Sequence, residues 1–79
     1  MKLAVVTWED ACEIDNEPWA DDNTDIFEYK PLLVTQVGYV FYDGPEGIVL
    51  TDGLTEAGQV SRRSQIPRGM VRQIKYLKT

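Results

Sequence analysis

The sequence predicts a small all-β domain, a barrel of five short strands, from three observations. Runs of strand-forming residues alternate with turn-forming glycine, proline and aspartate. A content of 43% hydrophobic and 10% aromatic residues is typical of a folded domain rather than of a disordered chain. A chain of 79 residues can build only one core, and barrel closure would protect the strand edges. We therefore expect one domain over residues 1–79.

The first predicted strand begins at Leu3, where LAVVTW alternates between two faces and is rich in β-branched residues. Trp8 at its end is expected to pack in the core or at the barrel edge. A long segment follows, WEDACEIDNEPWADDNTDIFEY, in which we expect a long loop with at most a single helical turn near residues 17–21. Pro18 and Pro31 cannot donate backbone hydrogen bonds and are unsuited to a central strand.

The strongest predicted strand is LLVTQVGYVFY, residues 32–42. Gly38 in its middle predicts a bulge or a sharp bend. DGPEG, residues 43–47, has the composition of a turn, and residues 48–51 then return as the third strand of a hairpin. A looser connection over residues 52–58 leads to a fourth strand at residues 59–66, polar enough to expose one face.

The last segment has two interpretations. Met70, Val71, Ile74 and Leu77 are spaced like the apolar stripe of a helix. Gly69 would fall in the first turn of that helix, so we favour a 3₁₀ turn at residues 67–70 that leads into a final strand. In that strand, Ile74 would share one face with Tyr76, and Val71 the other with Leu77.

IPRGMV, residues 66–71, resembles the end of an SH3-like barrel, where a strand runs into Ile-Pro, a 3₁₀ turn and a last strand. The long first loop would match the RT loop, and DGPEG a hairpin tip. The chain departs from eukaryotic SH3 domains because it lacks the Ala-Leu-Tyr-Asp-Tyr motif and a tryptophan before the hairpin tip. Binding of proline-rich ligands is therefore not implied.

The chain also resembles small uncharacterised proteins of bacteriophages and prophages. The shared pieces are VTWEDA at residues 6–11, Trp19, VGYV at residues 37–40, and IPRGMV followed by Ile74 and Leu77. This resemblance implies a phage origin and a fold, and it implies no activity.

Charge is distributed unevenly along the chain. Residues 1–31 carry nine acids and two lysines, residues 32–59 carry four acids and no base, and residues 60–79 carry six bases and no acid. The net charge of −5 opposes binding of nucleic acid by the whole surface. The two ends can instead attract each other, within one molecule or between copies. The bases are Arg62, Arg63, Arg68, Arg72, Lys75 and Lys78.

Residues with catalytic or metal-binding potential do not form a convincing set. Cys12 is the only cysteine and the chain has no histidine, which disfavours cysteine catalysis and a zinc site. Asp21, Asn23 and Asp25 have the initial spacing of a calcium loop, but Ile26 stands where glycine is needed. We expect no enzyme activity, no metal and no cofactor.

The acidic segment, residues 8–29, is the best candidate for a protein-binding surface. Charged loops steer association, and aromatic residues anchor it. Trp19 could be such an anchor or could fold back over the barrel, and both interpretations stay open. The candidate protein-binding residues are Glu13, Asp15, Glu17, Trp19, Asp21, Asp22, Asp25 and Tyr29.

These features predict a non-catalytic phage-type module in the bacterial cytoplasm that binds a host or phage protein. It would act as an acidic inhibitor of a host or defence protein of the anti-restriction or anti-CRISPR kind. One alternative is a virion or morphogenesis protein that self-associates as a homo-oligomer. A second is nucleic-acid binding through the basic C-terminal end. No apolar run is long enough to span a membrane.

Overall fold

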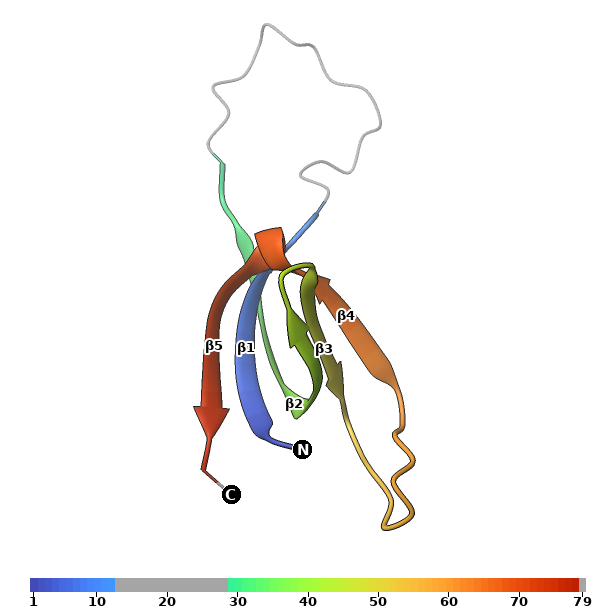
Figure 1. The fold of residues 1–79 in the computed structure, drawn as a ribbon. Coiled ribbons are helices and arrows are strands. Elements are labelled where there is room, and N and C mark those ends of the chain that lie inside the picture. Colours follow the sequence, from blue (N-terminus) through green and yellow to red (C-terminus); the bar gives the residue numbers. More distant parts are fainter. Residues whose placement is uncertain (13–28, 79) are drawn as a thin grey trace, which may run out of the picture.

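The computed structural model describes residues 1–12 and 29–78, which form a single antiparallel sheet of five strands in the order β4-β3-β2-β1-β5 (Figure 1). The mainly β prediction is confirmed. The helical turn expected near residues 17–21, Trp19 and the residues considered for calcium lie outside the described residues.

Strand β1, Leu3–Asp10, is the central strand of one half of the sheet. It pairs with β2 on one side and with β5, Val71–Leu77, on the other. Its alternation places Ala4 and Val6 on the inner side, where both are fully buried. The first predicted strand is therefore confirmed and extends two residues beyond Trp8.

Strand β2, Leu32–Gly44, belongs to both halves of the sheet. Its first half pairs with β1, and its second half pairs with β3, Gly47–Thr51. Figure 1 shows that β2 bends sharply in its middle and runs back along the sheet. The bend predicted at Gly38 is supported by packing, because a Cβ there would lie 3.0 Å from the Thr51 carbonyl oxygen. The bulge itself lies farther along, where the pairing shifts between Val40 and Tyr42.

The hairpin between β2 and β3 closes tightly at Pro45 and Glu46, as the DGPEG composition predicts. The predicted fourth strand at residues 59–66 is partly wrong, because β4 spans Arg63–Pro67. Residues 59–62 belong instead to a loop in which Leu54 and Val60 form an isolated bridge. Gly58 adopts a positive φ of 85°, and a side chain at this position would be strained.

The segment after β4 is a 3₁₀ turn, η1, Arg68–Met70, followed directly by β5. The strand interpretation of residues 71–77 is confirmed and the helical one is wrong. Pairing with β1 skips Arg72, since Thr7 pairs with Gln73 and Trp8 with Val71. This bulge turns Val71 to the same side as Ile74, so the predicted separation of their faces is wrong.

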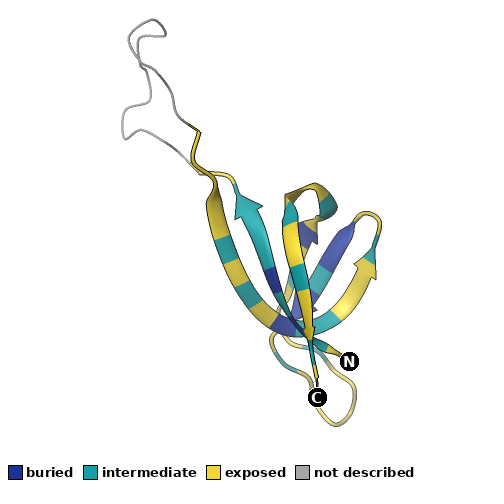
Figure 2. Ribbon diagram, turned by 90° about the vertical axis from the view of Figure 1, so that its left-hand side faces the viewer, coloured by how far each residue is buried: buried dark blue, intermediate teal, exposed yellow. Residues whose placement is uncertain are grey.

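A small core lies between the two halves of the sheet. It consists of Val6, Ile48, Leu50 and Ile66, which come from β1, β3 and β4. Trp8 is half-buried and packs against this core, as predicted. Figure 2 shows the contrast between this buried centre and the first half of β2, along which exposed and half-buried positions alternate.

Candidate functional site

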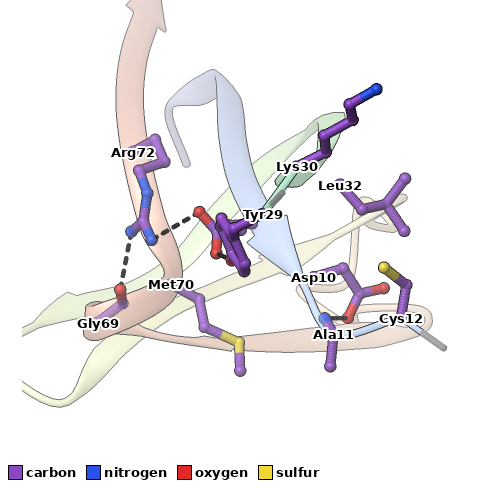
Figure 3. A pocket seen from close by; sticks show the side chains of 10 residues that line it. Asp10, Ala11, Cys12, Tyr29, Lys30, Leu32, Gly69, Met70 and Arg72 are labelled. Atoms are coloured by element: carbon purple, nitrogen blue, oxygen red, sulfur yellow. Dashed lines mark hydrogen bonds and ion pairs between the residues drawn. The ribbon is translucent and has the colours of Figure 1, made fainter. Parts of the chain in front are cut away.

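A cleft of about 550 Å³ lies at the end of the sheet from which the acidic segment departs. Both described ends of that segment, at Cys12 and Tyr29, line the cleft, and η1 forms its opposite wall (Figure 3). The cleft is lined by Glu9, Asp10, Ala11, Cys12, Tyr29, Lys30, Leu32, Gly69, Met70 and Arg72. The cleft lies at the end of β1, which stops at Asp10.

Glu9 is the centre of the polar contacts in the cleft. Arg72 donates a hydrogen bond from Nη2 to Glu9 Oε1 at 3.0 Å, and the hydroxyl of Tyr29 donates to Glu9 Oε2. Arg72 also donates from Nη1 to the Gly69 carbonyl oxygen at 2.8 Å (Figure 3). These contacts tie the end of the acidic segment to β1, to the bulge of β5 and to η1.

The contacts of Glu9 also decide its protonation. The hydrogen bond from Tyr29, followed by the contact with Arg72, holds the pKa of Glu9 below its ordinary value. The same hydrogen bond raises the pKa of Tyr29 above its ordinary value of 10.0. A general acid at neutral pH needs a raised carboxyl pKa. Glu9 is instead a fixed carboxylate, suited to position Tyr29 and Arg72.

Apolar side chains complete the cleft. Tyr29 is 63% exposed although its hydroxyl is engaged, so its ring is available to a ligand. Leu32 and Met70 are 45% and 37% exposed and lie on β2 and η1. Exposed aromatic and apolar side chains next to fixed polar groups are the usual composition of a protein-binding site.

The structure places only one of the predicted protein-binding residues. Tyr29 lines the cleft as described above. The other seven candidates, Glu13, Asp15, Glu17, Trp19, Asp21, Asp22 and Asp25, lie outside the described residues. Sequence reasoning missed Glu9, Met70 and Arg72 as site residues. The pairing of Glu9 with Arg72 joins positions 63 residues apart, and no local signal announces it.

Three of the basic residues of the C-terminal end have partners within the fold. Arg68 pairs with Asp43, and Arg72 pairs with Glu9. Arg63 lies over the ring of Phe41, 5.4 Å from its centroid. The guanidinium groups of Arg63, Arg68 and Arg72 therefore each have a different partner within the fold.

Comparisons with protein-family models, with curated proteins and with solved structures find no match to this chain. Among residues 1–12 and 29–78, no group of three or more Cys, Asp or Glu side chains could hold a metal ion. The same residues include no helix long and apolar enough to cross a membrane.

Proposed function

We propose that this protein is a non-catalytic protein-binding module, and that its partner contacts the acidic segment together with the cleft at its base. The observation that carries the proposal is the position of the cleft. The segment with most of the chain's acids begins and ends on its rim, beside the exposed ring of Tyr29 and the apolar side chain of Met70. A partner attracted by the acids would therefore meet an apolar anchor site directly beside them.

The partner that fits this arrangement is a protein with a basic groove. The net charge of −7 over residues 1–31 would steer a basic surface toward the segment. Burial of Tyr29, Leu32 and Met70 would then prolong the complex, because apolar anchors act mainly on dissociation. Such a groove is typical of proteins that hold nucleic acid, and occupying it would inhibit them.

We further infer that the fold is a small SH3-like barrel of the bacteriophage type, which acts in the cytoplasm of a bacterial host. The sharp bend of β2 and the 3₁₀ turn before β5 support this inference. The contacts of Asp43 at the end of β2 also support it. Asp43 accepts hydrogen bonds from Arg68 on η1 and from Tyr76 on β5.

The proposal is tested by capture of partners from bacterial lysate. The wild type is compared with a quadruple variant, Trp19→Ala with Asp21→Asn, Asp22→Asn and Asp25→Asn, and with a cleft variant, Met70→Ala. Leu54→Ala is the matched control, because Leu54 is 45% exposed on the loop after β3, outside the cleft.

We expect one partner to bind the wild type and Leu54→Ala, and to be lost or weakened in the other two variants. Calorimetry with the purified partner should give a dissociation constant that rises with salt. Equal affinity for all four proteins would contradict the proposal.

A further inference from the structure

A second surface lies beside the cleft, on the side of the sheet that faces away from the core, and the two meet at Glu9. Paired residues of an antiparallel sheet point to the same side. Val6 is in the core, so the adjacent row, in which Val5 pairs with Val37 and Lys75, points outward. We call this surface the outer face. Its apolar residues are Leu3, Val5, Leu33, Val37, Tyr39 and Leu77.

The outer face exposes large apolar side chains to solvent. Val37 and Leu33 on β2 are 56% and 54% exposed. Leu3, Val5 and Leu77 are half-buried and continue the surface across β1 and β5. The register places Leu3, Tyr39 and Leu77 in one row and Val5 and Val37 in the next, whereas Leu33 lies beyond a polar row of Thr7, Thr35 and Gln73. The two adjoining apolar rows form a surface of the kind that marks an interaction site.

The free charge of the outer face is positive, although the chain as a whole carries −5. Lys75 stands in the row of Val5 and Val37. Glu9 is the acidic residue on the described strands of this face, and its carboxylate accepts hydrogen bonds from Arg72 and Tyr29. The outer face therefore suits a ligand that combines acidic and apolar side chains.

The chain itself contains a sequence with this chemistry. Residues 13–28 include seven acids and no base, and Ile14, Trp19, Ile26 and Phe27 are interspersed among them. We propose that the outer face binds this acidic segment of a second copy of the chain, and that two copies do so reciprocally. The site lies on β1, β2 and β5, and the second copy is its occupant.

The size of the outer face favours reciprocal exchange over simple stacking of two sheets. Three strands at a spacing of about 4.8 Å and eight residues at about 3.3 Å each cover about 380 Å² in projection. Stacking two such faces would bury about 760 Å² in total, below the roughly 1,200 Å² of a stable interface. Two faces, each covered by a segment of the other copy, would bury about 1,500 Å².

The test is analytical ultracentrifugation of the purified full chain over a wide concentration range, at low and at high ionic strength. Face variants Val37→Asp and Lys75→Glu are compared with the segment variant Asp21→Asn, Asp22→Asn and Asp25→Asn. Leu54→Asp is the control, an exposed leucine outside the outer face. Circular dichroism establishes that every variant is folded before its dimerisation is measured.

We expect a dimer whose dissociation constant rises with salt, because the contact is partly electrostatic. Each face variant and the segment variant should raise this constant on the order of tenfold or more, whereas Leu54→Asp should leave it unchanged. A wild type that stays monomeric at every concentration would overturn the proposal. So would a dimer that responds to the face variants and not to the segment variant, because its two faces would then pack directly on each other.

Discussion

The hydroxyl of Tyr76 on β5 donates a hydrogen bond of 2.5 Å to Asp43 Oδ2 at the end of β2. Asp43 pairs with the core residue Ile48, and Tyr76 pairs with the buried Ala4, so both side chains start from the inner side of the sheet. Arg68 donates to the other carboxylate oxygen of Asp43 and to the carbonyl oxygens of Gly44 and Gly47. One carboxylate thus connects the hairpin to η1 and to β5.

Removing the Tyr76 hydroxyl should loosen this connection. Tyr76→Phe keeps the ring and deletes one hydrogen bond to a partly exposed carboxylate, so we expect the free energy of unfolding to fall by about 1 kcal/mol. Tyr42→Phe is the matched control, because the Tyr42 hydroxyl donates to Glu46 within the same hairpin turn. Urea denaturation of both variants measures the difference. Equal stability of the two would show that the Asp43 contact does not hold the halves together.

Stability should depend on pH at both ends of the scale. Hydrogen bonds from Tyr76 and Arg68 hold the pKa of Asp43 below its ordinary value of 3.8. A carboxyl with a lowered pKa in the folded state adds stability above its unfolded pKa, and this contribution is lost as pH falls below about 3.8. Thermal melts in acid should show this loss, and Asp43→Asn should flatten it. A wild-type acid limb with the same slope as the variant would contradict this assignment.

The alkaline limb has the opposite sign. The hydrogen bond to Asp43 raises the pKa of Tyr76 above its ordinary value of 10.0. The contribution of Tyr76 is therefore complete below the unfolded pKa and is lost as pH rises above about 10.0. Tyr76→Phe should reduce this dependence. Tyr29 and Tyr42 also have raised pKa values, so part of the alkaline loss should remain in the variant.

Two glycines should differ sharply in their tolerance of alanine. A Cβ at Gly47 would lie 2.3 Å from the backbone oxygen of Ile66, on the paired strand β4, and backbone cannot move aside without breaking that pairing. A Cβ at Gly69 would meet nothing within 4 Å. We expect Gly47→Ala to destabilise the fold by about 1–3 kcal/mol and Gly69→Ala to be neutral or slightly stabilising. Denaturation midpoints decide, and similar midpoints for the two variants would contradict the β3–β4 packing.

Local patterns in the sequence were sufficient for β1, the hairpin and the turn before β5. The alternation that begins at Leu3 and the composition of DGPEG predict structure that depends on residues close together in the sequence. The fourth strand was misplaced at its start because the composition of residues 59–62 suits a strand, whereas Val60 forms an isolated bridge with Leu54. The bulge at Arg72 was missed because it depends on the register with β1.

The candidate site was less accessible to sequence reasoning than the fold. Tyr29 was identified from its place beside the acids, and the structure puts it in the cleft. The cleft itself forms because the end of β1 meets η1, a contact between residues far apart in the chain. Its central pair, Glu9 and Arg72, joins two charged residues that are unremarkable in their own segments.

The core should be sensitive to truncation despite its small size. Leu50 is 1% exposed and belongs to the central cluster with Val6, Ile48 and Ile66. Leu50→Ala should cost about 2–5 kcal/mol through lost burial and the cavity left behind. Leu54→Ala, at a leucine that is 45% exposed, should change stability by less than about 0.5 kcal/mol. Chemical denaturation measures both, and a small effect at Leu50 would contradict the assigned core.

Cys12 offers a chemical test of the cleft that needs no mutation of the partner-binding residues. It is exposed and lines the cleft just beyond the end of β1. A bulky maleimide should therefore label the folded protein without prior unfolding, and the attached group would occupy space that a partner needs. We expect labelled protein to lose partner capture while its circular dichroism is unchanged. Cys12→Ser treated with the same reagent is the control and should retain capture. Full capture by the labelled protein would place the partner contact away from the cleft and on the acidic segment alone.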